Sequence, residues 1–285
     1  MAAAAAPKGR RARSEAKQKE RQKERDKKLR ARAGSRWRIH YDIQGPRVRL
    51  GILWFVSALV ALSLGLIGVV PFFGVAFAAA ASHALRTWRA RKYELDPTYA
   101  LLGTAVVVAL AAFGPEFMGL GVIALAGLAL AATLGSGEDG PTVSVGNAGM
   151  ILQCALPTAV AGGCFVLLAE REIWLAVALV MLASAYESGD FLIGSGAGNN
   201  IEGPLAGLAA VLVMSMVVAA GGFPPFGVVE AMAFGVAVAP LALAGQYLAT
   251  AMLPHARAFA PALRRIDSLL LAAPIWYVGV NLFVS

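Results

Sequence analysis

The sequence predicts an all-α, polytopic integral membrane protein with about nine transmembrane helices. Of its 285 residues, 58% are hydrophobic and only 15% are charged. A soluble globular domain carries about 45–50% apolar residues and about 25% charged residues. The apolar residues also form successive runs, each close to the roughly 20 residues that a helix needs to cross a bilayer. The composition therefore excludes an ordinary soluble domain.

Residues 1–48 differ from the rest of the chain and are expected to form a basic cytoplasmic tail. Seventeen of the 25 lysines and arginines lie between Lys8 and Arg49. The first part of this tail has almost no large apolar side chain, so we expect it to be largely disordered. Trp37 and Tyr41 favour an end that lies on the membrane surface. The tail should contact anionic lipid headgroups. A nucleic-acid partner is the alternative for such a basic run, and we expect none.

Nine apolar segments are expected as helices, and the count could also be eight or ten because boundaries are the weakest part of such a prediction. They lie at residues 50–68, 70–87, 98–114, 117–134, 148–168, 172–188, 203–221, 224–250 and 267–284. Residues 49–146 form an N-terminal set of helices, and residues 147–285 form a C-terminal set that carries the polar motifs. Small residues in the N-terminal set favour close helix packing and would suit a homodimer: Gly119, Gly121 and Gly127.

The loops between these segments predict the orientation of the chain. Cytoplasmic loops of membrane proteins carry an excess of lysine and arginine. With the N-terminus inside, the inner loops are 88–97, 135–147, 189–202 and 251–266, and only one basic residue, Arg171, falls in an outer loop. We therefore expect a multi-pass protein of the cell membrane (inner or plasma membrane), with a cytoplasmic N-terminus and the C-terminus outside.

A polar stretch from Ser184 to Pro204 interrupts the apolar C-terminal set. It contains three carboxylates, namely Glu187, Asp190 and Glu202. Carboxylates beside membrane helices are costly and usually functional, although a solvated loop at the membrane face would also account for them. Glu187 and Asp190 are three residues apart, so they share a face if the helix continues that far.

The same stretch contains a glycine-rich segment, Gly194-Ser-Gly-Ala-Gly198. Successive backbone N–H groups in such a loop can form a nest for an anion, and a flexible turn between helices is the alternative. Asn200 is a plausible N-cap, and Pro204 suits the first turn of the following helix. The start of that helix would then face a phosphate group.

A second polar stretch, Arg264-Arg265-Ile266-Asp267-Ser268, precedes the last apolar segment. Taken singly, its residues are explained by an aspartate that caps a helix and by flanking basic residues at a cytoplasmic face. The two cysteines, Cys154 and Cys164, lie in one apolar segment and indicate neither a disulfide framework nor a zinc site.

Three stretches occur in the order of one known signature. They are Ala185-Tyr186-Glu-Ser-Gly189 with Gly194, Gly198-Asn199-Asn200-Ile201-Glu202-Gly203, and Arg264-Arg265-Ile266-Asp267-Ser268 with Pro274. In this order they resemble the signature of the phosphatidate cytidylyltransferase (CDP-diacylglycerol synthase) family. The resemblance covers about residues 147–285. It implies that family's membrane fold and the conversion of CTP and phosphatidate into CDP-diacylglycerol.

The resemblance also implies roles for individual residues. Asp267 and Glu202 would be catalytic, and Asp267, Asp190 and Glu187 would hold Mg²⁺. The substrate-binding residues would be Arg265, Ser268, Tyr186, Gly194, Gly196, Gly198, Asn199 and Asn200. Oxygen ligands of this kind are those that Mg²⁺ prefers.

The sequence departs from the family signature at several positions. Leu182 stands where the family has an aspartate, and Asn199-Asn200 replace a Lys-Thr pair. Gln246 and Arg264 stand where the family has carboxylates that help to hold the metal. Glutamine and arginine remove those ligands, although arginine can bind a phosphate directly.

Three functions therefore remain open for this sequence. The first is a nucleotidyltransferase of phospholipid biosynthesis that uses CTP and Mg²⁺. The second is a non-catalytic relative, a pseudoenzyme, that binds lipid or acts as a scaffold in the cell membrane. The third is a small transporter, which the placement of the charges at one face disfavours because transport sites usually lie near the bilayer midplane. These residues do not decide whether the protein is an enzyme.

Overall fold

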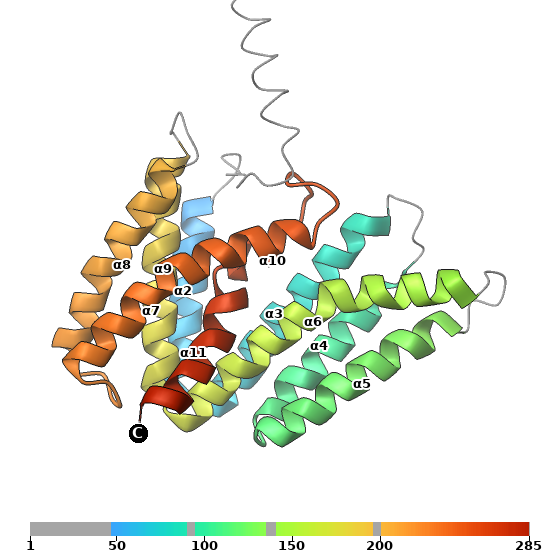
Figure 1. Ribbon diagram of the computed structural model, residues 1–285, viewed down its shortest axis with the longest axis horizontal. Helices are drawn as coiled ribbons and strands as arrows, with labels where there is room; N and C mark the ends of the chain where they lie inside the picture. Colours follow the sequence, from blue (N-terminus) through green and yellow to red (C-terminus); the bar gives the residue numbers. More distant parts are fainter. Residues whose placement is uncertain (1–46, 90–94, 135–140, 196–200, 285) are drawn as a thin grey trace, which may run out of the picture. The chain divides into compact units, whose positions relative to one another are not determined.

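In the computed structural model, every regular element in the described part of the chain is an α-helix (Figure 1). The structure describes residues 47–89, 95–134, 141–195 and 201–284. The helices are α2 (Arg47–Ser63), α3 (Leu66–Arg89), α4 (Pro97–Ala111), α5 (Pro115–Leu134), α6 (Pro141–Arg171), α7 (Ile173–Gly194), α8 (Glu202–Ala220), α9 (Val228–Ala251), α10 (Leu263–Ile266) and α11 (Leu269–Phe283). The basic tail, residues 1–46, lies outside the described residues.

The length and composition of the helices confirm the prediction of a polytopic membrane protein. Within the described residues, seven helices are long and apolar enough to cross a bilayer, the last of them running through α10 and α11. Two further apolar helices, Arg49–Ser63 and Pro97–Phe113, are shorter. Together they correspond to the nine apolar segments of the sequence.

Most boundaries fall within a few residues of the predicted ones, but the first break was predicted in the wrong place. The sequence places it at residues 69–71, next to Pro71. Pro71 instead lies inside α3, and the chain turns at Gly65, which has φ +64°. Glycine adopts this left-handed conformation without the steric cost that a side chain would add. The glycine, and not the proline, therefore ends the first helix.

A second correction concerns the loop that was expected at residues 189–202. Helix α7 continues to Gly194, so Glu187 and Asp190 both belong to a helix. The two residues are three positions apart on one continuous helix, so they share a face of it, as predicted. The last segment, expected at residues 267–284, is α11, and a short helix that was not expected, α10, precedes it across Asp267 and Ser268. Pro204 lies in the first turn of α8, as expected.

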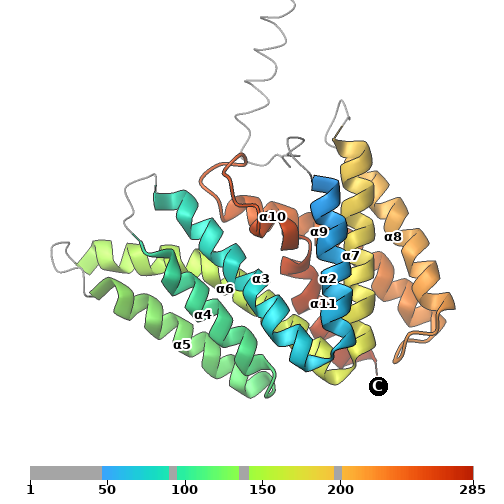
Figure 2. The same ribbon diagram turned by 180° about the vertical axis from the view of Figure 1, so that it is seen from behind.

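The helices pack in two overlapping groups. Helices α4 and α6 contact each other and both contact α3 and α5, while α7, α8 and α9 contact one another. Helix α11 contacts α6 and α9 and so joins the two groups, and α2 contacts α3 and α7. The start of α2, the end of α7, the start of α8 and residues 252–262 all lie at one end of the helices, and the C-terminus lies at the other (Figures 1 and 2). The polar stretches of the sequence thus meet at a single end.

Glycines bring the helices of this end unusually close together. A Cβ atom on Gly189 would lie 2.5 Å from the carbonyl oxygen of Ala206, which places α7 against α8. A Cβ atom on Gly245 would lie 2.2 Å from the carbonyl oxygen of Asp267, so α9 touches the break between α10 and α11. The glycines are needed because no side chain fits at these contacts.

We expect Gly245→Ala to destabilise the protein and to displace Asp267. The added methyl group would meet backbone rather than a flexible side chain, and overpacking of this kind costs about 1–3 kcal/mol. Gly127→Ala is the matched control, because a Cβ atom there meets nothing within 4 Å. Alanine in a helix interior should stabilise by about 0.5–1 kcal/mol. Thermal unfolding of both variants in detergent measures the difference, and equal midpoints would contradict the close contact.

Candidate functional site

A cavity of about 710 Å³ opens at the polar end of the helices. Its wall combines charged and polar side chains with large apolar ones, contributed by α2, α7, α8, α9 and α10. The polar residues that line it include Glu187, Ser188, Asp190, Gln246, Arg264, Arg265 and Asp267. The two polar stretches of the sequence therefore face the same cavity, together with Gln246 of α9.

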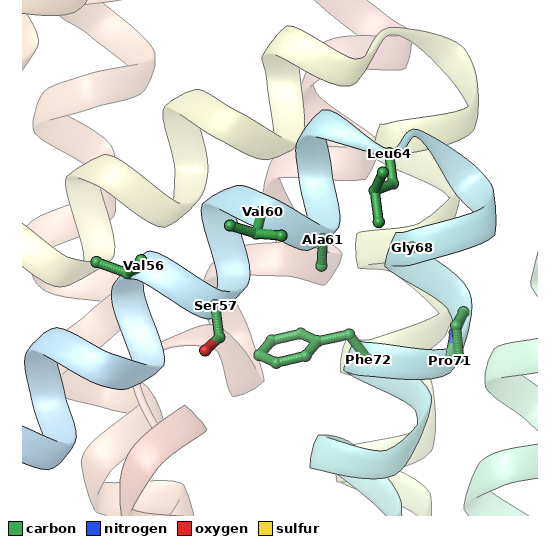
Figure 3. A pocket seen from close by; sticks show the side chains of 8 residues that line it. All are labelled: Val56, Ser57, Val60, Ala61, Leu64, Gly68, Pro71 and Phe72. Atoms are coloured by element: carbon green, nitrogen blue, oxygen red, sulfur yellow. The ribbon is translucent and has the colours of Figure 1, made fainter.

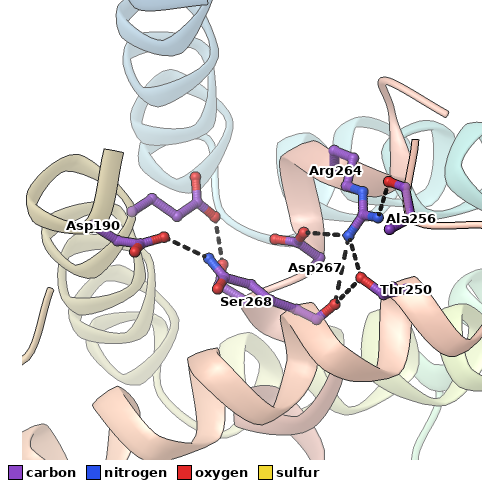
Figure 4. A network of polar contacts seen from close by, with 8 residues as sticks. Asp190, Thr250, Ala256, Arg264, Asp267 and Ser268 are labelled. Atoms are coloured by element: carbon purple, nitrogen blue, oxygen red, sulfur yellow. Dashed lines mark hydrogen bonds and ion pairs between the residues drawn. The ribbon is translucent and has the colours of Figure 1, made fainter. Parts of the chain in front are cut away.

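Arg264 is the centre of a polar network on one side of this cavity (Figure 4). One Nη atom lies 3.7 Å from the carboxylate of Asp267 and donates to the hydroxyl of Thr250 at 2.9 Å. The other donates to the carbonyl oxygen of Ala256 at 3.1 Å. The Thr250 hydroxyl donates in turn to the carbonyl oxygen of Gln246. The guanidinium group is thus fixed in place and neutralises a buried carboxylate.

Asp190 and Gln246 form a second polar contact between α7 and α9. The side-chain amide of Gln246 donates to the Asp190 carboxylate at 3.1 Å. Asp190 is only 2% exposed and Gln246 only 6% exposed. The other amide atom, Gln246 Oε1, is buried and has no hydrogen-bond partner among the described residues. An unsatisfied buried acceptor costs about 1–3 kcal/mol, so this atom calls for a donor or a cation.

Glu187 completes the polar side of the cavity. Its carboxylate accepts a hydrogen bond of 2.5 Å from the hydroxyl of Ser268. Ser268 is buried at the break between α10 and α11, so this bond ties α7 to the start of the last helix. The predicted substrate-binding residue Ser268 therefore contacts a predicted metal ligand directly.

The three carboxylates expected to hold Mg²⁺ all line the cavity, each beside a different partner. Asp267 lies beside Arg264, Asp190 beside Gln246, and Glu187 beside Ser268. Within the described ranges, no group of three histidine, cysteine or acidic side chains is close enough to hold a metal ion. Mg²⁺ binding at Asp267, Asp190 and Glu187 stays a prediction, and any such ion would need oxygen ligands that a substrate supplies.

The other predicted site residues differ in whether they line the cavity. Arg265 lines the cavity, and Gly194 is the last residue of α7. Tyr186 is buried with its ring against Gly207, and the exposed Glu202 begins α8; neither lines the cavity. The glycine-loop residues Gly196, Gly198, Asn199 and Asn200 lie outside the described residues, so their predicted roles stay predictions.

The rest of the cavity wall is largely apolar and reaches the outer surface of the helices. Trp54, Phe55, Met181 and Met214 belong to this wall. Three further lining residues are largely exposed: Ile52 at 61%, Leu192 at 70% and Val213 at 64%. These three residues belong to apolar helices, so the exposed part of the wall is apolar. The cavity thus has a polar side and an apolar side.

A second hollow lies between α2 and α3 and contains no charged side chain (Figure 3). Its eight lining residues include Val60, Leu64 and Phe72, and Ser57 is its polar member. The Ser57 side chain and the Phe72 ring point toward each other in this view. The hollow therefore resembles an apolar packing groove between two helices more than a site for chemistry.

Two residues of the site were not predicted as site residues, although both were noted as departures from the family signature. Arg264 and Gln246 replace expected carboxylates, and each contacts a carboxylate that remains. Thr250, one helical turn after Gln246, was not predicted at all. A threonine in an apolar helix commonly donates a hydrogen bond to the backbone of its own helix, so Thr250 did not stand out as a site residue in the sequence.

The sequence was also compared with known proteins. No protein-family model matches the chain. No curated protein matches it either.

Proposed function

We propose that this membrane protein binds a phospholipid precursor in the cavity between α2, α7, α8 and α9, in the manner of a divergent phosphatidate cytidylyltransferase. The observation that supports the proposal most strongly is the amphiphilic wall of one cavity. Arg265 can face a phosphate, while Trp54 and Met214 can pack against acyl chains. A ligand that fits both parts is itself an amphiphile. In an active enzyme, CTP and Mg²⁺ would join phosphatidate at the polar side of this cavity, where Asp267, Asp190 and Glu187 would hold the ion.

A non-catalytic lipid-binding or scaffold protein is the second candidate. The contact of Arg264 with Asp267 favours it, because the guanidinium neutralises a carboxylate that metal chemistry would use. A small transporter is less favoured, since Asp190 lies near the end of α7, and Arg264 and Arg265 lie in the short α10 before the last helix, rather than in the middle of a span.

The remaining expectations belong to the same proposal. The protein would lie in the cell membrane with the N-terminus and the cavity's polar end at the cytoplasmic face, where the basic tail contacts anionic headgroups. A homodimer would use the N-terminal helices. Gly121 already packs against Val107 within the chain, whereas a Cβ atom on Gly119 or Gly127 meets nothing within 4 Å. The latter two therefore leave room for a second copy.

Lipid binding is tested by narrowing the apolar part of the cavity. In Val213→Trp, the larger side chain would occupy the space between α2 and α8, and we expect phosphatidate to bind at least about tenfold more weakly, which is about 1.4 kcal/mol. Val217→Trp is the control, because Val217 is also exposed on α8 but does not line the cavity. Binding of radiolabelled phosphatidate to the purified protein, with and without Mg²⁺, gives the affinities. Equal affinities for the two variants would contradict the proposal.

Catalysis is tested separately from binding. Purified protein is supplied with CTP, phosphatidate and Mg²⁺, and CDP-diacylglycerol is measured. An active enzyme would lose this product in Asp267→Asn while lipid binding persists. If the original protein binds phosphatidate but forms no product, the non-catalytic candidate is the correct one.

A further inference from the structure

Two polar groups that line the cavity have no partner in the part of the chain that the structure describes. The first is the guanidinium group of Arg265, which makes neither a hydrogen bond nor an ion pair there. The second is the side-chain oxygen of Gln246, Oε1. A guanidinium group can only donate hydrogen bonds, and an amide oxygen can only accept them. A single ligand that satisfies both must therefore combine an acceptor with a donor.

The requirement at Gln246 is set by an amide that is buried and held in one orientation. Gln246 is only 6% exposed, and its Nε2 atom donates to the Asp190 carboxylate at 3.1 Å. A carboxylate accepts hydrogen bonds, so this contact identifies the NH₂ end of the amide and leaves Oε1 as the end without a partner in the described residues. A ligand hydroxyl group satisfies this neutral oxygen without the cost of taking a charged group out of water.

The requirement at Arg265 is different, because this residue is a half-buried cation. Its side chain reaches α2, where Nη1 lies 3.3 Å from the position that a Cβ atom on Gly51 would take. The neighbouring guanidinium of Arg264 is already held by Asp267 and Thr250. Arg265 therefore remains to present its planar fork of donors to a phosphate.

We propose that the cavity binds a phosphodiester lipid whose headgroup carries a free hydroxyl group. The phosphate lies at Arg265, the hydroxyl group donates to Gln246 Oε1, and the acyl chains pack against the apolar wall that includes Trp54 and Met214. The single charge of a phosphodiester matches one guanidinium group. This inference rests on the proposed lipid site, and it adds a hydroxylated headgroup that phosphatidate lacks.

The test compares two lipids that differ only in the hydroxyl groups of the headgroup. The probes are tritiated dioleoyl phosphatidylglycerol and tritiated dioleoyl phosphatidylpropanol, which has the same charge and headgroup length. Each is bound to the purified full-length protein in detergent with EDTA. We expect phosphatidylglycerol to bind at least about tenfold more tightly, because phosphatidylpropanol leaves the buried acceptor unpaired.

Two variants assign the two parts of this preference. Gln246→Met removes the acceptor at nearly constant length, so both lipids should bind with the affinity that phosphatidylpropanol has for the original protein. Gln153→Met is the control, because Gln153 is exposed and does not line the cavity. Arg265→Gln should weaken both lipids at least about tenfold and keep their ratio, while Arg257→Gln, at an exposed position outside the cavity, should change neither.

Equal affinities of the original protein for the two lipids would overturn the inference, and so would a preference that persists in Gln246→Met. If Gln246→Met binds neither lipid, the comparison on the original protein decides alone. Binding of phosphatidate with no preference for phosphatidylglycerol over phosphatidylpropanol would overturn the inference but leave the proposed function standing. If neither these lipids nor phosphatidate binds, with EDTA or with Mg²⁺, the proposed function fails as well.

Discussion

Replacing Arg264 by glutamine should lower the free energy of unfolding by about 3 kcal/mol, because it leaves the buried Asp267 without its cation. The guanidinium also donates to Thr250 and Ala256, and a glutamine side chain cannot replace all of these contacts. The destabilised region would include the break between α10 and α11, where Ser268 holds Glu187. Thermal unfolding in detergent, followed by circular dichroism, measures the change.

Two variants separate this effect from a general loss of charge. Arg265→Gln removes a neighbouring guanidinium that has no such network in the described residues, and it should change the free energy of unfolding by less than about 0.5 kcal/mol. Adding Asp267→Asn to Arg264→Gln should recover part of the loss, since the carboxylate that Arg264 neutralises is then removed as well. If Arg264→Gln and Arg265→Gln unfold at the same temperature, the role of Arg264 as an internal cation is wrong.

Replacing Trp276 by alanine should be about as destabilising, at roughly 3–5 kcal/mol, because a large buried side chain leaves a cavity. Trp276 is 1% exposed, and its ring packs edge-on against Phe226 and Phe234. Its indole N–H donates to the carbonyl oxygen of Phe234 at 3.1 Å, which joins α11 to α9. Loss of this contact should loosen the packing of the last helix, α11, against α9.

Trp174→Ala is the matched control for this prediction. Trp174 also packs edge-on against one phenylalanine, Phe223, but it is exposed. Its removal should cost about 1 kcal/mol, close to the value of one aromatic pair. Thermal unfolding of the two alanine variants side by side distinguishes the cases. A smaller loss for Trp276→Ala than for Trp174→Ala would show that α11 is not anchored as described.

The helical membrane fold could be predicted from the sequence because it depends on local hydrophobicity. The hydrophobicity of each apolar segment predicts a helix, whichever other helices that segment packs against. The turn at Gly65 was missed because the nearby Pro71 gives the stronger local signal, and helix α3 accommodates that proline. Loop and helix could not be distinguished at residues 189–194, since polar residues on a helix face and polar residues in a loop have similar composition.

The candidate site could be predicted only in part. Glu187, Asp190, Asp267 and Arg265 stood out as charged residues in an apolar chain, and all of them line one cavity. The partners of these residues depend on which helices are adjacent in the fold. A local sequence pattern does not predict which helices are adjacent. Gln246 and Thr250 belong to an otherwise apolar helix, so only the packing of α9 against α7 and α10 reveals that they contact the polar stretches.

The most direct test of the central claim, that a phospholipid occupies the cavity from the side of the membrane, is photolabelling. A phospholipid with a diazirine near the end of one acyl chain is bound to the purified protein, irradiated, and the labelled peptides are identified by mass spectrometry. We expect labelling of α2 and α8 around Phe55 and Val213, which excess unlabelled lipid removes. Label that is concentrated instead on exposed residues away from the cavity, such as Ile123, and that resists competition would contradict the account.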